Sequence, residues 1–292
     1  MLSLKTKIEL GGMGPEHAIY LFPFGDMHTE NKGFHDKGFK QFTDDVESRE
    51  RALSFHIGDP TDLANRRTGR ALKDIESVGG MEEIKNTIDE KAFAAQDKVI
   101  RLINPIKDTL QWSIIGNHSW PYFDTDTYGA STDVNISNAL GSPMTTGLAT
   151  TKIGLAVGSK STSIRIMGRH GLGGASTETG DQNKLIKEIM QYVDVDIFVA
   201  GHTHHHYVRK LRPLYGFHGI YPISHNRHVG RTGTFKRNLL IDDPMHPSYE
   251  EQAGYSAAGL GYLRYKVWLK RKYRGKKDTI IPHIEGTAVS VD

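Results

Sequence analysis

Apolar runs rich in β-branched and aromatic residues recur along the first two thirds of the chain, and each gives way to a small polar cluster. Such a run is typical of a buried strand that ends in a loop. The runs cover residues 18–28, 52–62, 111–120, 163–171 and 196–204. Their last positions are Gly, Asp, Asn or His, so the pattern predicts chemically active side chains at the ends of strands.

Between these runs lie segments in which apolar residues recur with the spacing of an amphipathic helix. We expect helices over 36–52, 81–106 and 180–193, the last with a Gly-Asp start suited to an N-cap. Strands that alternate with helices predict an α/β fold. In such folds ligands gather at the carboxyl ends of the strands, where loops from several strands meet, so the polar clusters should converge in space.

The pattern changes after about residue 205, where short strands with Gly, Pro and Tyr are expected. Residues 260–273 predict a late strand with a basic tip. At 292 residues the chain lies at the upper end of what one hydrophobic core supports. We therefore expect a single domain over 1–292, with a core of about 16–240 and with 245–292 as a C-terminal appendage that closes the sandwich.

Composition narrows the chemistry. The chain has no cysteine, so disulfides and thiolate metal sites are excluded and any ion must be held by oxygen and imidazole. A net charge of +3 is too small to imply a polyanionic partner by itself. No stretch approaches the ~18 apolar residues of a membrane span, and residues 1–15 lack the apolar core of a signal peptide. We expect no membrane partner and a cytoplasmic location.

Four histidines crowd the segment VAGHTHHHYVRK at 199–210. On an extended segment, side chains at i and i+2 point to the same face, so His202 and His204 are predicted to converge on one object. The same alternation turns His205 away, which favours a structural role for it. His206 shares the face of His202 and His204 and is therefore a candidate substrate contact.

Together, the polar clusters supply eight candidate ligands: Asp26, His28, Asp59, Asn117, His118, His170, His202 and His204. Carboxylates, imidazoles and an amide oxygen without sulfur suit manganese, iron or zinc. Eight groups exceed the need of one ion. Two ions about 3.5–4 Å apart, bridged by one carboxylate, would use all but one of them, and that arrangement serves phosphoryl chemistry. The remaining histidine could protonate a leaving oxygen.

The clusters also form an ordered set of short motifs over residues 18–210. They read D-x-H (Asp26, His28), G-D-x-x-D (Gly58, Asp59, Asp62), G-N-H (Gly116, Asn117, His118), H-G (His170, Gly171) and G-H-x-H (Gly201, His202, His204). This order resembles the calcineurin-like metallophosphoesterase superfamily. The later stretches RTGTF at 231–235 and 248–262 are similar to the ending of calcineurin-like phosphoesterases carried by bacteriophages and prophages, whose location would be the cytoplasm of the host cell.

The resemblance implies a four-layer α/β/β/α sandwich with two mixed β-sheets and a dinuclear centre on one edge. It assigns the first ion to Asp26, His28, Asp59 and His204, and the second to Asp59, Asn117, His170 and His202. Asp59 would bridge the two, a hydroxide between the ions would attack phosphorus, and His118 would steady or protonate the departing oxygen. We expect Mn²⁺, with Fe, Zn, Ni or Mg as alternatives.

One position departs from many members of the family, because G-N-H is followed here by Ser119 and Trp120 instead of an acid. In the phosphoprotein phosphatase branch the acid that orients the G-N-H histidine comes from the last position of G-D-x-x-D, which Asp62 matches. A carboxylate bonded to a ring nitrogen fixes its tautomer, so Asp62 is the expected partner of His118. The alternative for Asp62 is a helix or turn cap.

The ligand set does not choose a substrate, because the same centre serves several kinds of phosphoesterase. The phage resemblance favours a phosphodiesterase or nuclease acting on nucleic acid or nucleotides. The alternatives are a phosphomonoesterase acting on nucleotides or phosphoproteins, and a catalytically silent metal-binding protein. Candidate phosphate contacts are Arg169, the pair Arg66 and Arg67, and the Gly-rich segment 170–181, which a plain connector would resemble. Residues 270–277 fit a nucleic-acid backbone or a solvated hairpin tip. The oligomeric state is left open.

Overall fold

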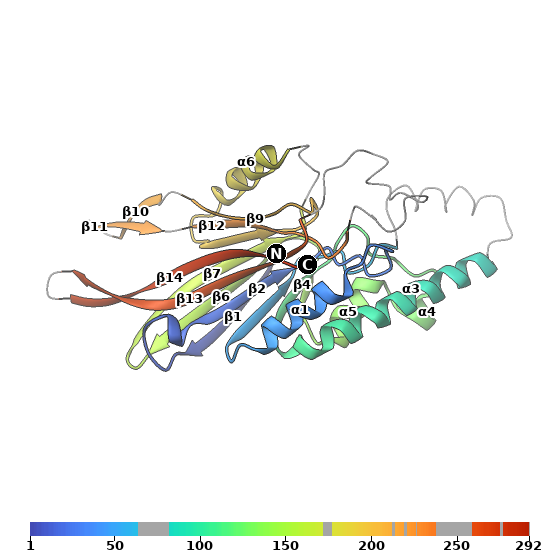
Figure 1. Cartoon of the computed structure of the whole chain (residues 1–292), viewed down its shortest axis with the longest axis horizontal. Helices are drawn as coiled ribbons and strands as arrows, with labels where there is room; N and C mark the ends of the chain where they lie inside the picture. The colour runs from blue at the N-terminus through green and yellow to red at the C-terminus, as the bar shows by residue number, and fades with distance from the viewer. Residues whose placement is uncertain are drawn as a thin grey trace.

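The computed structural model describes residues 1–63, 82–171, 177–211, 214–218, 221–225, 227–237, 259–274 and 277–291. Within them the strands form two six-stranded sheets and a two-stranded hairpin of β10 (Leu214–His218) and β11 (Tyr221–His225) (Figure 1). Arg66, Arg67 and most of 248–262 lie outside the described residues, as does the Gly-rich part of 170–181 at 172–176.

The first sheet has the order β1-β6-β7-β8-β12-β9. Its strands are β1 (Leu2–Glu9), β6 (Ala149–Val157), β7 (Lys160–Arg169), β8 (Ile197–Ala200), β12 (His228–Thr232) and β9 (His206–Lys210). The β6–β7 and β9–β12 pairs are antiparallel and the other pairs are parallel, so the sheet is mixed.

The second sheet has the order β14-β13-β2-β3-β4-β5. Its strands are β14 (Lys277–Ser290), β13 (Gly261–Arg274), β2 (Ile19–Phe24), β3 (Ala52–His56), β4 (Leu110–Ile114) and β5 (Met144–Thr145). The strands from β2 to β5 are parallel, whereas β13 runs antiparallel to both β2 and β14. Residues 261–290, within the segment expected to be an appendage, thus supply two strands of this sheet.

Three clusters of buried side chains separate four layers. The central cluster joins the two sheets, with Ile153 and Ile164 on one side and Leu21 and Phe55 on the other. A second cluster packs α1 (Asp36–Glu47), α3 (Glu82–Ile103) and α5 (Thr132–Ala139) onto the second sheet. A third packs α6 (Glu178–Ile189) onto the first sheet. The expected α/β/β/α arrangement with two mixed sheets is confirmed.

The helices begin and end where local chemistry allows. Helix α1 starts after His35, whose ring Nδ1 accepts the N–H of Gly38 at 3.3 Å, and it stops at Glu47, short of the predicted 36–52. Helix α3 gives way to a 3₁₀ turn at η2 (Asn104–Thr109), because Pro105 cannot donate the backbone hydrogen bond that an α-helix requires. Helix α6 starts after the cap Thr177, before the predicted residue 180.

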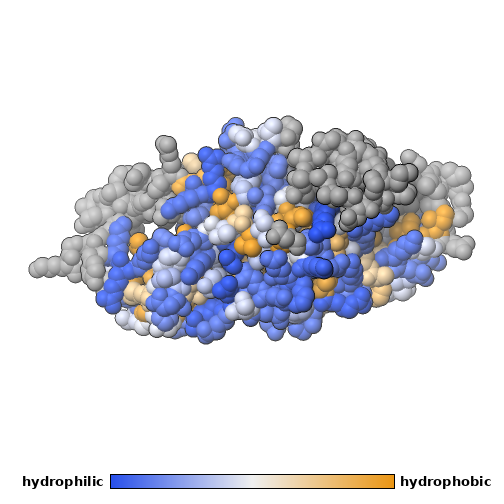
Figure 2. Space-filling view, viewed as in Figure 1, coloured by the Kyte–Doolittle hydropathy of each residue, from blue (hydrophilic) through white to orange (hydrophobic). Residues whose placement is uncertain are grey.

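The remaining short elements are η1 (Pro15–His17) and α4 (Thr125–Tyr128). Among the residues that the structure describes, no helix is both long enough and apolar enough to cross a membrane. The face drawn in Figure 2 is mainly hydrophilic with scattered hydrophobic residues. Because β2, β3 and β4 are parallel, and β7 and β8 are parallel, the loops after these strands gather at one edge of the sandwich.

Candidate metal centre

Among the described residues, the polar clusters meet at this edge in three groups of potential ligands, one of which, His28, Asp62 and His118, shares His28 with another and includes the pair described below. The nearest ligand-type atoms of Asp26, His28 and His204 lie within 4.8 Å of one another, and we call these residues the enclosed group. The atoms of Asp59, His170 and His202 meet the same limit. With Asn117, which contacts His170, these three form the open group.

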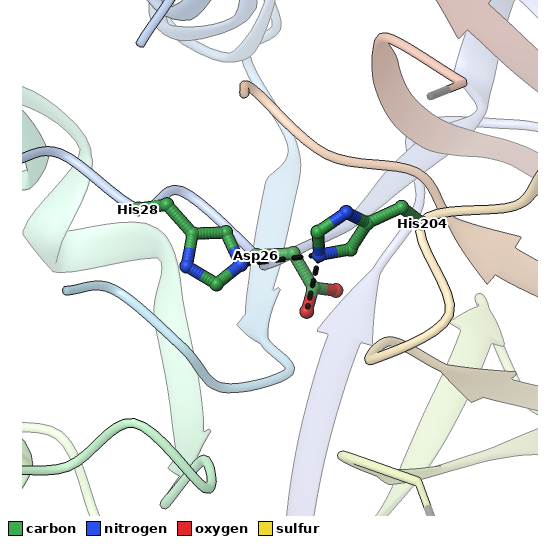
Figure 3. A group of neighbouring side chains, drawn as sticks. All are labelled: Asp26, His28 and His204. Carbon is green, nitrogen blue, oxygen red and sulfur yellow. Dashed lines mark hydrogen bonds and ion pairs between the residues drawn. The ribbon is translucent and has the colours of Figure 1, made fainter. Parts of the chain in front are cut away.

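In the enclosed group, two imidazoles face each other above a buried carboxylate (Figure 3). His28 Nε2 lies 3.1 Å from His204 Nε2, and His204 Nε2 lies 3.8 Å from Asp26 Oδ1. Asp26 is 0% exposed and His28 2%. Asp26 and His28 come from the loop after β2 and His204 from the loop after β8, so the group is assembled from both sheets.

In the open group, three atoms crowd around one point. His170 Nε2 lies 2.8 Å from Asn117 Oδ1 and 3.0 Å from Asp59 Oδ2. The His202 ring packs edge-on against His170, with ring centroids 5.1 Å apart. The other ring nitrogen of His170, Nδ1, donates to the Ile57 carbonyl at 2.9 Å, so Nε2 is the ring atom directed at Asn117 and Asp59. Asp59 outweighs burial and raises the pKa of His170 to about 9, so a metal ion would have to displace the proton on Nε2.

The backbone is unusual at five of these ligands. The non-glycine residues with positive φ in the described part of the chain are Asp26 (50°), His28 (51°), Asp59 (50°), His202 (75°) and His204 (56°). Asp and His tolerate the left-handed region better than most residues, but each such position still costs about 1–3 kcal/mol. The surrounding structure must hold these turns, which aim the side chains into the centre.

The left-handed turns correct the expectation of an extended segment at 202–206. His202 and His204 do not share one face of a strand, because the chain bends between β8 and β9 and sends each ring to a different group. For the same reason, the prediction that His206 lies on their face is wrong. Its Nε2 donates to the Tyr262 carbonyl at 3.0 Å. His205, predicted to be structural, places Nδ1 3.5 Å from Asp181 Oδ2.

The motif glycines allow the loops to approach one another closely. A Cβ at Gly116 would lie 1.9 Å from Asp59 Oδ1, and one at Gly201 would lie 2.5 Å from Asp26 Oδ2. Gly58 also has a φ of +109°, and a Cβ there would meet the His170 ring at 2.6 Å. A larger residue at any of the three would force the loops apart.

Backbone amides from neighbouring motifs hold both buried carboxylates. The His202 amide donates to Asp26 at 3.0 Å (Oδ1) and 2.9 Å (Oδ2). The His118 amide donates to Asp59 Oδ1 at 3.0 Å. Each carboxylate therefore bonds to a loop from a different strand and fixes that loop relative to its own.

Burial and neighbouring charges set the protonation of the centre. Burial raises the pKa of Asp26 to about 6, whereas His170 outweighs burial at Asp59 and holds its pKa below the usual range. Burial, assisted by His170, lowers the pKa of His202 to about 4. Burial and His28 lower the pKa of His204 well below its ordinary value. Both rings are thus neutral at pH 7, the form that binds a metal ion.

His118 and Asp62 form a pair beside the two groups. His118 Nδ1 lies 3.0 Å from Asp62 Oδ1, and Asp62 Oδ2 accepts from Asn31 Nδ2 at 3.0 Å and from Lys236 Nζ at 3.4 Å. Despite burial, the bonds from His118 and His28 hold the pKa of Asp62 far below its usual range. Asp62 in turn outweighs burial and raises the pKa of His118. The other ring nitrogen of His118 lies 3.9 Å from Asp59 Oδ2.

Arg231 and Asp181 support the histidine loop, a role that was not expected for the first residue of RTGTF or for the acid of the Gly-Asp helix start. Arg231 Nε and Nη2 donate to Asp181 at 2.8 and 2.6 Å, and Nη1 donates to the carbonyl of Gly201. Tyr207 also donates to Asp181, at 3.0 Å. The predicted phosphate contact Arg169 pairs with Glu188.

Comparison with protein-family models and with curated proteins gives no match. Among solved structures, a predicted phosphoesterase from Streptococcus pneumoniae is 11% identical with a TM-score of 0.33, over 91% of this chain and 98% of that chain. NAD nucleotidase from Haemophilus influenzae is 10% identical with a TM-score of 0.40, over 91% of this chain and 50% of that chain. A protein of unknown function from Aquifex aeolicus is 14% identical with a TM-score of 0.30, over 64% of this chain and 80% of that one. These scores are too low to carry an inference, so function is inferred below from the residues of the site.

Proposed function

We propose that this chain is a metal-dependent phosphoesterase that uses two divalent ions to hydrolyse phosphodiester bonds of nucleic acid or nucleotides. One observation carries the proposal: two adjoining groups of carboxylate and imidazole ligands lie beside a histidine–carboxylate pair that belongs to neither group. The groups adjoin directly, because the Met27 amide next to Asp26 donates to the Asp59 carbonyl at 2.8 Å.

The spacing of the side-chain atoms fits divalent ions. With metal–ligand bonds of about 2.1 Å, neighbouring ligands of an octahedral ion lie about 3 Å apart. The contacts of His170 Nε2, at 2.8 and 3.0 Å, and the 3.1 Å between His28 and His204 match that separation. The donor set contains no sulfur, which suits manganese, our first choice, or another borderline or hard ion.

Each of the two groups would hold one ion. Asp26, His28 and His204 would hold the first ion, and Asn117, His170 and His202 the second. Asp59 would serve both, since its Oδ2 contacts His170 and its backbone bonds to the loop of the enclosed group. When bound, the ions would supply Lewis acidity that polarises the phosphoryl group and lowers the pKa of attacking water.

His118 supplies the proton that the leaving oxygen needs. Asp62 Oδ1 lies 3.0 Å from its Nδ1 and holds that side of the ring, so the proton available for transfer is on Nε2, which lies 3.9 Å from Asp59 Oδ2. The raised pKa of His118 keeps this ring charged to a higher pH than an ordinary histidine and suits it to act as an acid. Asp62 acts as a positioning residue.

Residues 231–235 and 248–262 resemble phage-borne phosphoesterases. This resemblance favours a phosphodiester over a phosphomonoester as the substrate. Monoester hydrolysis on nucleotides or phosphoproteins is the alternative. A catalytically silent metal-binding protein is a third, less favoured, possibility, because none of the family's ligand positions is lost in this chain.

A reconstitution experiment tests the proposal. Purified protein is stripped with chelator, reloaded with Mn²⁺ and analysed for bound metal. It is then assayed on bis(p-nitrophenyl) phosphate, single- and double-stranded DNA, RNA, cyclic mononucleotides, nucleotide monophosphates and a phosphopeptide. We expect two ions per chain and turnover of diesters. Two bound ions without turnover of any substrate would instead support the silent protein, and turnover of monoesters alone would support the alternative.

A further inference from the structure

A pocket of about 460 Å³ adjoins the open group. Three segments line it: 115–117 after β4, 146–148 between β5 and β6, and 169–171 after β7. Asn117 and His170 belong both to the pocket wall and to the open group. A group that occupies this pocket would therefore contact the candidate ligands directly, and the volume lies within the roughly 300–1,000 Å³ usual for small-molecule sites.

The pocket wall combines apolar and polar surface. Ile115 and Leu148 contribute hydrocarbon, whereas Gly116, Gly147 and Gly171 contribute backbone, of which the Gly116 and Gly147 amides already donate to Asp133 Oδ2 and Thr145 Oγ1. Arg169 contributes a planar guanidinium that Glu188 holds in place, and such a group stacks well on a flat ring. The pocket thus suits a flat group with apolar faces and polar edges.

We propose that this pocket holds a nucleobase of the substrate while the phosphate lies at the metal centre. The inference rests on the proposed phosphoesterase function and narrows it to nucleotide substrates. A phosphotyrosine ring has the same shape, but its hydrocarbon edge would leave the carbonyls of the three glycines, to which no described residue donates, without partners, which is unfavourable. The ring edges of a nucleobase carry donors and acceptors that can satisfy them.

Substitution of Gly147 can test the pocket, because it adds a side chain to the pocket wall. A Cβ at this position would meet nothing within 4 Å, and its φ does not require glycine. A valine should therefore occupy the pocket without disturbing the fold. Gly154 in β6 is the matched control, because a Cβ there would make only ordinary contacts, at 3.7 Å or longer, and Gly154 does not line the pocket.

Two substrates with the same leaving group separate base recognition from chemistry. Thymidine 5′-(4-nitrophenyl phosphate) carries a base, and methyl 4-nitrophenyl phosphate does not, yet both release nitrophenolate. We expect the manganese-loaded protein to prefer the thymidine ester in kcat/KM. Gly147→Val should lower that value about 10- to 100-fold, mainly through KM, and should change the methyl ester little. Gly154→Val should change neither.

A binding measurement makes the test independent of turnover. Adenosine and thymidine, which lack phosphate, are titrated into metal-free protein and followed by saturation-transfer NMR; Gly147→Val should abolish the signal and Gly154→Val should keep it. If Gly147→Val proves unfolded by circular dichroism, Thr146→Tyr on the same loop replaces it.

The outcomes distinguish the two proposals. Equal use of both esters, or equal loss on both in Gly147→Val, would overturn the nucleobase pocket while leaving the phosphoesterase intact. Preference for a phosphotyrosine peptide, lost in Gly147→Val, would overturn it in favour of a phenyl pocket. Nucleoside binding that depends on Gly147 in a protein that hydrolyses neither ester would support the pocket and count against the proposed function.

Discussion

The enclosed and open groups share one edge of the sandwich but differ in their surroundings. Behind the enclosed group, His28 Nδ1 lies 3.5 Å from Asp62, whose carboxylate also contacts His118 and Lys236. The open group contains the exposed Asn117 and adjoins the 460 Å³ pocket. One group is thus backed by protein, whereas the other faces the space that a substrate can enter.

The different surroundings of the two groups predict different rates of metal exchange. Ligands with restrained side chains and little solvent access favour tight, slowly exchanging metal binding. We therefore expect the ion of the enclosed group to exchange more slowly than the ion of the open group. In the proposed function, the open group would be the side from which the organic part of a substrate approaches.

Removal of Asp59, which the proposed function assigns to both ions, should have the largest effect. Asp59→Asn takes a charge from both groups, so bound metal should fall at both, and turnover should fall by more than the 10²–10⁴-fold typical of a lost general acid. Replacing a ligand of one group, as in Asn117→Ala, should cost less. Metal analysis and diester kinetics measure both effects. Normal turnover with two ions in Asp59→Asn would refute the dinuclear assignment.

Removal of the proton donor should leave both groups filled. His118→Gln should keep two ions per chain but lower turnover of a sugar-alkoxide diester about 10²–10⁴-fold. The loss should be much smaller on a nitrophenyl ester, because nitrophenolate leaves without a proton. Asp62→Asn should follow the same trend more mildly. Equal losses on both esters would argue instead that His118 binds phosphoryl oxygens, and loss of an ion would contradict its assignment.

The loop at 201–205 gives one histidine to each group, so weakening its support should affect both groups together. Arg231→Met leaves the buried Asp181 without its charged partner and should lower the free energy of unfolding by about 3–5 kcal/mol. Arg231→Lys keeps a charge and should cost less. Urea unfolding and metal analysis test this prediction. Loss of metal from only one group would show that the two histidines are positioned independently.

The smallest effect should come from His228, a histidine outside both groups. It shows how burial changes the pKa of a histidine away from the candidate metal centre. His228 is 3% exposed, and burial, assisted by Lys210, lowers its pKa from 6.5 to about 4. Between those values the unfolded chain binds a proton that the folded one does not, so stability should fall as pH drops from about 6.5 to 4. The effect is at most about 3 kcal/mol.

Its control is His228→Phe, which cannot titrate. The difference in unfolding free energy between pH 7 and pH 5 should be smaller in the variant than in the parent chain. Urea unfolding at the two pH values measures it. An identical pH dependence would mean that His228 is solvated or protonated in the folded protein.

The local hydrophobic patterns predicted most individual strands and helices, but not how the strands pair. The apolar runs marked β2, β3, β4, β7 and β8, and three helical segments appeared with shifted ends. Strands β1 and β6 were not expected. The pairing of Tyr265 in β13 with Leu21 in β2 could not be predicted, because it joins residues that no local pattern connects.

In the candidate site, too, the residue types followed from the local sequence, whereas their geometry depended on distant residues. The residue types and their order at strand ends were enough to name candidate ligands that lie close together in the structure. Strand alternation, however, gave the wrong geometry for His202, His204 and His206, because left-handed turns depend on what surrounds the loop. The Arg231–Asp181 pair was missed since its members are 50 positions apart and meet only in the folded protein.

The separation of the ligands along the chain also has a kinetic consequence. His28 and His204 face each other although 176 positions separate them, so the centre forms only after the two sheets have packed together. We expect interactions that need both sheets in place to form after the folding transition state and therefore to act mainly on the rate of unfolding. Bound ions should therefore slow unfolding and lengthen the lifetime of the native protein, without accelerating its folding.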